Sequence, residues 1–377
     1  MTTFQHTFEP ASKAPPGTST NLILLPQEIE DAGLLEVLQT PGVAMGTWSI
    51  LGALLDPGTS EFVFKEPLGR AREVKVAVSG LFGRFVARAY AMRYLGYTHF
   101  SHIESPPMTL SGPINAIVDR VPGRKGDMPD WVAWSPSGGH AIIEAKGSHD
   151  PAGPNAILKR AYAQAERAFI TVGGRKAKLK RYAIATRWGF ANGPFHDPML
   201  AVKDPDDPGE NVSQGELDGA AIGIVRRHIA GLLKPLGHPE LAAAIRRLVS
   251  TENERLTAVT RGYANALLNQ TEPRSIDASA SVSGIDLVGG FVARGGPLGA
   301  GVTVDRAKQD LLVELDLRPT FVGIERAAVL AAIEGDLPKI SALAKDGAPG
   351  SDGVDGVRRD QSSTWVVRLE AEGSRVK

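Results

Sequence analysis

The stretch that decides the fold is Asp127–Gly147, with the sequence DMPDWVAWSPSGGHAIIEAKG. Two apolar runs within it, Trp131–Trp134 and His140–Ile143, flank the segment Ser135–Gly139, which is rich in serine, proline and glycine. Aromatic and β-branched runs joined by such a segment are typical of a β-hairpin. We therefore predict two antiparallel strands joined by a tight turn.

Three charged residues are expected to meet at the open end of this hairpin. Asp130 opens the first strand, and Glu144-Ala145-Lys146 closes the second. Because side chains alternate along a strand, Glu144 and Lys146 share one face, and Asp130 lies beside them. Hard cations such as Mg²⁺ or Mn²⁺ take carboxylate oxygens as ligands and keep several waters. The pattern predicts a cation held by the two carboxylates, with Lys146 orienting water or stabilising negative charge. The alternative is an ordinary surface hairpin whose charged ends pair across the strands.

Pro129-Asp130, a spacer and Glu-x-Lys together resemble the signature of the PD-(D/E)xK nuclease superfamily, over roughly residues 68–190. The resemblance implies an α/β restriction-endonuclease-like core, in which helices flank a mixed sheet. It also implies Mg²⁺- or Mn²⁺-dependent hydrolysis of phosphodiester bonds, in DNA rather than RNA, with the Ala145 carbonyl assisting the two carboxylates. Many members of the superfamily carry a further acidic ligand on the first helix, and Glu73 is the candidate on a helix predicted from Leu68 to Leu95. A favourable first-turn carboxylate is the alternative for Glu73.

Basic and polar residues around the hairpin are the candidates for contact with nucleic acid. Gln164 lies on a helix predicted from Asn155 to Ile170, where some members of the resembled superfamily place a glutamine for this purpose. The other candidates are basic residues in two clusters, namely Arg124, Lys125, Arg175, Lys176, Lys178 and Lys180. Solvated surface is the alternative for each of them. The 42 basic and 42 acidic residues cancel, so binding has to rest on such local patches.

The length of 377 residues allows two or three domains. We predict an N-terminal arm and cap over residues 1–66, with a loose arm at 1–20 and no chemistry. A nuclease-like domain with a helical extension follows over 67–270, the extension consisting of helices at 220–233, 239–249 and 252–268. After a Ser-rich boundary comes a C-terminal α+β module over 285–377, with strands at 285–294, 311–317 and 364–369 and helices within 321–344. This module carries no catalytic constellation and is open to partner binding, substrate recognition or self-association.

The chain has no cysteine, which excludes disulfides and thiolate metal sites and suits a reducing cytoplasm. We see no signal peptide and no apolar run of membrane-spanning length, so we expect a cytoplasmic protein without a membrane partner. Motifs typical of nucleotide-binding loops, serine hydrolases and zinc proteases are missing. The metal-carboxylate site is therefore the one candidate active centre. The resemblance implies a DNA nuclease that serves phage defence, restriction or repair, and the Ala/Gly/Arg-rich composition suggests a bacterial source. Two alternatives remain open: a catalytically inactive nuclease-like scaffold that binds nucleic acid or protein, and a DNase toxin delivered to rival cells.

Overall fold

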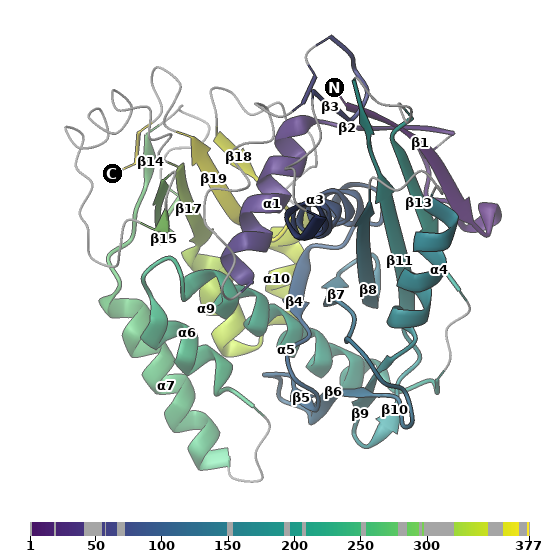
Figure 1. Ribbon diagram of the computed structural model, residues 1–377. Helices are drawn as coiled ribbons and strands as arrows, with labels where there is room; N and C mark the ends of the chain where they lie inside the picture. Colours follow the sequence, from purple (N-terminus) through teal and green to yellow (C-terminus); the bar gives the residue numbers. More distant parts are fainter. Residues whose placement is uncertain are drawn as a thin grey trace.

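The centre of the protein is a mixed sheet of seven strands with helices on both faces (Figure 1). The computed structural model describes residues 2–18, 20–40, 55–56, 58–65, 72–148, 154–191, 197–205, 209–249, 254–277, 285–293, 296–297, 320–345, 357–368 and 375–376. The strand order of the central sheet is β2-β1-β13-β11-β8-β7-β4. The prediction of an α/β protein with a mixed sheet flanked by helices is confirmed.

Six elements between residues 72 and 187 form and cover the half of this sheet that carries the predicted hairpin. In chain order they are α3 (Arg72–Arg93), β4 (His99–His102), β7 (Trp131–Ser135), β8 (Gly139–Ser148), α4 (Pro154–Ala165) and β11 (Lys180–Arg187). Strands β4, β7 and β8 pair antiparallel in succession, and β11 pairs parallel with β8. A parallel neighbour needs a crossover connection, and α4 lies within it. The predicted hairpin is confirmed, although β8 continues past Lys146 to Ser148.

Helices α3 and α4 cover opposite faces of the sheet. Side chains alternate along β11, so Tyr182 and Ile184 join the core that contains α3, whereas Ala183 and Ala185 pack with α4. The predicted glycine stop of α3 is confirmed, because Gly96 has a positive φ of 71°. The prediction that α4 runs to residue 170 is wrong. The helix ends at Ala165, and the β-branched and aromatic run that follows forms β9 (Ala168–Val172).

The N-terminal residues belong to the sheet, so the prediction of a loose arm over residues 1–20 is wrong. Strand β1 (Thr2–Glu9) pairs antiparallel with β2 (Asn21–Leu24) and parallel with β13 (Met199–Lys203). Alternate side chains of β1, those of Thr2, Phe4, His6 and Phe8, are buried. A strand buried along one face has this period of two. Helix α1 (Pro26–Gln39) follows and packs against α3.

Three further helices lie where the sequence predicts them, namely α5 (Gln214–Leu233), α6 (Pro239–Arg246) and α7 (Glu254–Gln270). Short strands make two small sheets beside the central one. They are β3 (Val63–Phe64) with β12 (Gly189–Phe190), and β5 (Met108–Thr109), β6 (Ala116–Arg120), β9 and β10 (Arg175–Lys176). None of the helices in the described ranges is both long and apolar enough to cross a membrane.

The C-terminal residues form a second sheet with helices beside it. Its strands and helices are β15 (Leu287–Ala293), β16 (Gly296–Pro297), β17 (Thr320–Glu325), α9 (Arg326–Glu334), α10 (Leu337–Lys345), β18 (Val357–Arg359) and β19 (Thr364–Arg368). A pair of two-residue strands, β14 (Ile276–Asp277) and β20 (Arg375–Val376), adds a further ladder. The helical prediction over 321–344 is wrong at its start, because Phe321–Glu325 lies in the buried strand β17. The predicted strand at 311–317 lies outside the described residues.

The two sheets are joined through α1, α3 and α5, which lie between them in Figure 1. Arg358 and Arg368 of the C-terminal sheet both pair with Asp31 of α1, at 3.1 and 2.5 Å. The buried Arg226 of α5 donates to the carbonyls of Ala332 and Ile333 in α9. The C-terminal residues therefore pack directly against the helices that cover the central sheet.

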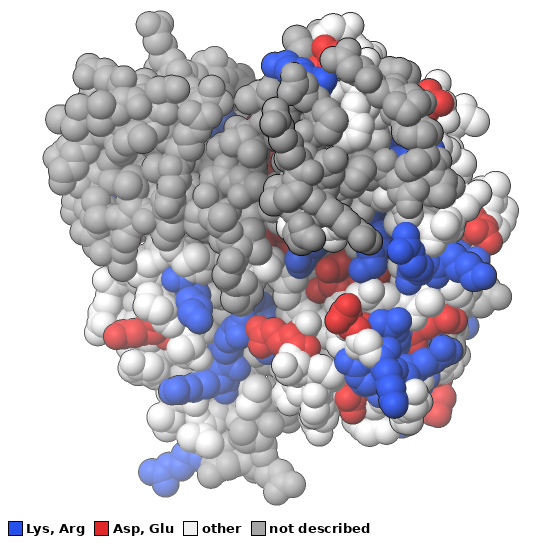
Figure 2. Space-filling view, viewed as in Figure 1, with Lys and Arg blue, Asp and Glu red and all other residues white. Residues whose placement is uncertain are grey.

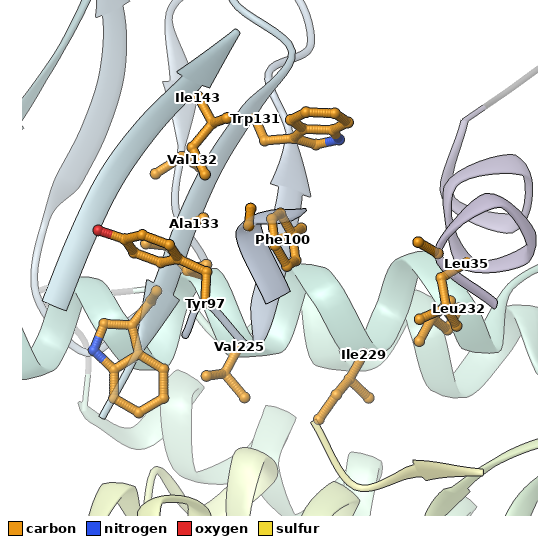
Figure 3. Close-up of a cluster of buried hydrophobic side chains, with 14 of the residues drawn as sticks. Leu35, Tyr97, Phe100, Trp131, Val132, Ala133, Ile143, Val225, Ile229 and Leu232 are labelled. Atoms are coloured by element: carbon orange, nitrogen blue, oxygen red, sulfur yellow. The ribbon is translucent and has the colours of Figure 1, made fainter. Parts of the chain in front are cut away.

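Large apolar side chains fix the hairpin on the helix layer (Figure 3). Trp131 and Phe100, from the adjacent strands β7 and β4, are fully buried, with ring centroids 6.1 Å apart. Figure 3 shows Val225 and Ile229 of α5 on the side of the sheet that these rings occupy. Burial of a large apolar side chain contributes about 1.5 to 3 kcal/mol. The start of β7 is thereby held rigidly, and Asp130 directly precedes it in the chain.

Candidate metal and catalytic site

The hairpin is open at the end where the predicted site lies. Strand β7 covers β8 only from Gly139 to Ile143, whereas β11 pairs with β8 as far as Ser148. At this end of the hairpin the last pair joins Trp131 to Ile143. Asp130 and Glu144 are the next residues beyond that pair, Asp130 just before β7 and Glu144 within β8. The edge of β8 beyond Ile143 is therefore free to receive side chains rather than a neighbouring strand.

The structure brings the three predicted residues together at this edge. The Ala145 amide donates to Asp130 Oδ2 at 2.8 Å, and the Asp130 amide donates to Glu144 Oε2 at 3.1 Å. Lys146 Nζ lies 2.5 Å from Glu144 Oε1. These contacts are reciprocal, so each carboxylate is fixed by the backbone of the other strand. Asp130, Glu144 and Lys146 therefore lie in contact with one another, as the sequence predicts.

Glu144 is a buried carboxyl group next to a second carboxyl group. Its side chain has no exposed surface, whereas that of Lys146 is 37% exposed. Burial raises the pKa of Glu144 well above its usual range, the charge of Asp130 and a hydrogen bond with Asp130 raise it further, and Lys146 opposes the shift. Two carboxyl groups so close together need a proton or a cation between them. Acidic groups whose pKa is raised in this way are common at functional sites.

Helix α3 reaches the site through a close contact between two glycines. A side chain at Gly147 would overlap the Ser79 carbonyl oxygen and lie 2.7 Å from the Gly83 Cα, and a side chain at Gly83 would overlap the Gly147 amide. Helix and strand can approach this closely only because both residues lack a Cβ. The next residue, Arg84, is therefore placed at the mouth of the hairpin, with its Nε 3.3 Å from Asp130 Oδ1.

A fully buried carboxylate, Glu36 of α1, lies behind Arg84. Its Oε1 is 2.6 Å from Arg84 Nη2 and 3.2 Å from His102 Nε2. Its Oε2 accepts hydrogen bonds from Arg88 Nη1 at 3.2 Å and from Trp131 Nε1 at 3.1 Å. Burial alone would raise the pKa of Glu36, but His102, Arg84 and Arg88 together hold it well below its usual range. Glu36 is therefore an ionised anchor for the arginine that contacts Asp130.

An open pocket of about 600 Å³ lies between α3 and the free end of β8. Its lining includes Arg84, Asp130 and Lys146, with Ser79 and Ser148 at its polar wall. This volume is in the range of pockets that hold small molecules, about 300 to 1,000 Å³. The charged groups therefore face a space that a substrate segment can enter.

The donors at this edge fit one hard divalent cation. Asp130 and Glu144 offer carboxylate oxygens, and the buried Glu144 Oε1 contacts Lys146 without hydrogen-bond geometry. The Ala145 amide donates to Asp130, and the carbonyl of Ala145 points to the same edge of β8 as this amide. Among the described residues no group of three or more His, Cys, Asp or Glu side chains could hold a metal ion. A cation here would take its remaining ligands from water and substrate, as Mg²⁺ commonly does.

The other predicted acidic ligand, Glu73, stays a prediction. It is the second residue of α3, and its side chain lies outside the described residues. Glu104, which follows β4, pairs instead with Arg227 and Arg246. Residues 1–66, where the sequence suggests no chemistry, supply Glu36 of α1, which contacts the site through Arg84.

Gln164 is buried, so the alternative that it faces solvent is wrong. It is 8% exposed, and its amide donates to the Met128 carbonyl at 2.7 Å, two residues before Asp130. Its position on the inner face of α4 explains its burial. Gln164 therefore fixes the segment that leads into the site, and its contact with nucleic acid stays a prediction.

The basic candidates are exposed or partly exposed, and three of the six have partners of their own. Arg175 pairs with Glu216 at 2.5 Å, and Lys180 with Asp204 at 3.4 Å. Lys176 Nζ lies 5.3 Å from the centre of the Phe169 ring. The others, Arg124, Lys125 and Lys178, are exposed. Figure 2 shows basic side chains gathered at the lower right, over the region of β9 and β10 in Figure 1, with acidic side chains among them.

Arg84 and Glu36 are the two site residues that the sequence did not single out. The only signal for Arg84 was the Gly83-Arg84 pair within an otherwise apolar helix face, and Glu36 gave no signal within its own helix. Comparisons of the chain with protein-family models, with curated proteins and with solved structures found no match. Function is therefore inferred from the residues of the site alone.

Proposed function

We propose that the protein is a Mg²⁺- or Mn²⁺-dependent nuclease that hydrolyses phosphodiester bonds in DNA. The observation that carries the proposal is the contact of the buried Glu144 carboxylate with both Asp130 and Lys146, at the open end of a hairpin beside a pocket. Asp130 and Glu144, with the Ala145 carbonyl, would hold the cation. When bound, a cation of this kind polarises a phosphoryl oxygen and lowers the pKa of a bound water.

The side chains around the site have separable tasks. The partly exposed ammonium of Lys146 is fixed by Glu144 and faces the pocket, where it can orient a water molecule or donate to a phosphate oxygen. Asp130 is held by the Ala145 amide and by Arg84, so its carboxylate does not rotate away from Glu144. Such rigid placement is what a site needs to act on a reacting group without reorganisation.

The order of elements supports the same proposal. Helix α3, the meander β4-β7-β8, helix α4 and the parallel strand β11 follow the order helix, strands, helix, strand of the PD-(D/E)xK superfamily that the signature resembles. We propose a restriction-endonuclease-like core on this ground, and phage defence, restriction or repair in the bacterial cytoplasm as its setting. The C-terminal sheet would recruit a partner or a second copy.

One observation favours the alternative of an inactive nuclease-like scaffold. Arg84 already neutralises one oxygen of Asp130, and no third carboxylate is placed at the site within the described residues. A scaffold of this kind would bind DNA or protein without turnover. Metal-dependent turnover therefore separates the two functions.

The test is a cleavage assay on supercoiled plasmid, linear duplex and single-stranded DNA, with Mg²⁺, Mn²⁺ or a chelator. We expect cleavage with either metal and none with the chelator. Lys146→Ala should lower the rate about 100-fold or more. The control Lys234→Ala, which removes an exposed lysine at the end of α5, should leave the rate within about threefold. Equal rates for Lys146→Ala and wild type would overturn the proposal, and DNA binding without cleavage would favour the scaffold.

A further inference from the structure

We propose that the site takes a single divalent cation per chain, because the guanidinium of Arg84, anchored by Glu36, occupies the side of Asp130 where a second cation would bind. This inference rests on the proposed function and concerns how many ions the site holds. Two-metal phosphodiesterases place their ions about 3.5 to 4 Å apart and bridge them with shared oxygens. Here the geometry assigns the position of the second ion to the side chain of Arg84.

The two oxygens of Asp130 face different partners. Oδ2 accepts from the Ala145 amide at 2.8 Å, on the side of Glu144, whereas Oδ1 lies 3.3 Å from Arg84 Nε. A carboxylate that bridges two cations through both of its oxygens offers one oxygen to each of them. The oxygen that would serve the second cation is therefore already in contact with a positive charge.

Arg84 is held in that place by groups that are themselves buried. Its Nη2 lies 2.6 Å from Glu36 Oε1, and the Glu36 side chain has no exposed surface. Arg88 and Trp131 hold the other oxygen of Glu36. The guanidinium keeps its charge at all ordinary pH values, and Glu36 raises the pKa of Arg84 further. It can therefore neither leave Asp130 easily nor become neutral.

The charged side chains around the site cancel one another before any cation binds. Three carboxylates face three cationic groups, namely Glu36, Asp130 and Glu144 against Arg84, Arg88 and Lys146. One divalent cation held by Asp130 and Glu144 would leave the site with a positive charge that suits a phosphate. A second would stand beside Arg84 without a further carboxylate among the described residues.

The experiment counts Mn²⁺ ions bound to the full-length protein by calorimetric titration and by the electron paramagnetic resonance signal of free Mn²⁺. Only ions that are lost in Glu144→Gln are counted, so that surface sites do not contribute. We expect one ion in wild type and in the control Arg93→Gln, whose arginine pairs with Glu28 on the same helices. We expect two in Arg84→Gln, or in the double variant Glu36→Gln/Arg84→Gln if the single variant fails to fold.

The outcomes separate this inference from the proposed function. Two ions in wild type, or one ion in the folded variants that lack Arg84, would overturn the inference and leave a metal-dependent nuclease intact. No ion in wild type would overturn both. One ion in wild type together with two in the Arg84 variant would establish the guanidinium as the group that excludes the second cation.

Discussion

Replacement of Glu36 by glutamine tests whether the charged cluster behind the site is as tightly built as its contacts imply. The substitution keeps the shape of the side chain and removes its charge. Arg88, whose side chain is fully buried, then loses its carboxylate partner, and Arg84 keeps only Asp130. Breaking a buried ion pair by removing one partner costs about 3 to 5 kcal/mol, because the remaining charge stays buried. We expect a loss of this size in the free energy of unfolding.

Glu28→Gln is the matched control, since it makes the same change in the same helix. Glu28 pairs with Arg93, whose side chain is 34% exposed, and Glu28 also accepts from the Leu25 amide at the start of α1. Glutamine can keep this capping contact, and a solvated ion pair contributes about 1 kcal/mol or less. Urea denaturation followed by circular dichroism compares the two variants at equal slope. A Glu36→Gln cost within about 1 kcal/mol of the Glu28→Gln cost would refute the account of the cluster.

Three further predictions concern the residues that shape the site. Gly147→Ala should lower the free energy of unfolding by about 1 to 3 kcal/mol, because the added Cβ overpacks against α3. Gly80→Ala, whose added Cβ has no atom near it, should stabilise the helix. Thermal denaturation measures both variants, and equal shifts in Tm would contradict the close contact of Gly147 with α3. In metal-free protein the raised pKa of Glu144 makes the folded state bind more protons than the unfolded state above about pH 4.5, so stability should fall as pH rises through the folded pKa. Urea titrations across that window should show the fall in wild type and a flatter profile in Glu144→Gln, and parallel profiles would refute the shift. Gln164→Ala should cost about 1 to 3 kcal/mol, because the partly buried hydrogen bond to the Met128 carbonyl is lost, and a change below about 0.5 kcal/mol would show that this contact is dispensable.

The hairpin and its three charged residues could be predicted because the determining signals are local. A turn segment between two apolar runs specifies the strands, and alternation along β8 places Glu144 and Lys146 together. The same kind of signal was present but missed in β1, where Phe4, His6 and Phe8 alternate with exposed residues. The extension of α4 beyond Ala165 failed for a related reason, since small apolar residues at helical spacing continued into a run with strong β-propensity.

Glu36 and Arg84 could not be predicted, because their roles depend on how distant elements pack. Within its own helix Glu36 is an ordinary charged residue, and such residues are almost never fully buried unless paired. Its partners come from α3 and from strands β4 and β7, at separations of 48 to 95 residues along the chain. Gln164 shows the same effect, since its partner at Met128 is set by the position of α4 on the sheet. The local sequence pattern predicts Asp130 and Glu144, whereas the contacts of Arg84, Glu36 and Gln164 around them depend on tertiary packing.

The most direct test of the central claim is the rate of Mg²⁺-dependent DNA cleavage by Glu144→Gln set against wild type. Glutamine can still accept from the Asp130 amide, so the fold of the hairpin should persist by circular dichroism. The loss of one carboxylate oxygen ligand should nevertheless lower the rate about 100-fold or more. A Glu144→Gln variant that cleaves DNA with Mg²⁺ at the wild-type rate would contradict the account.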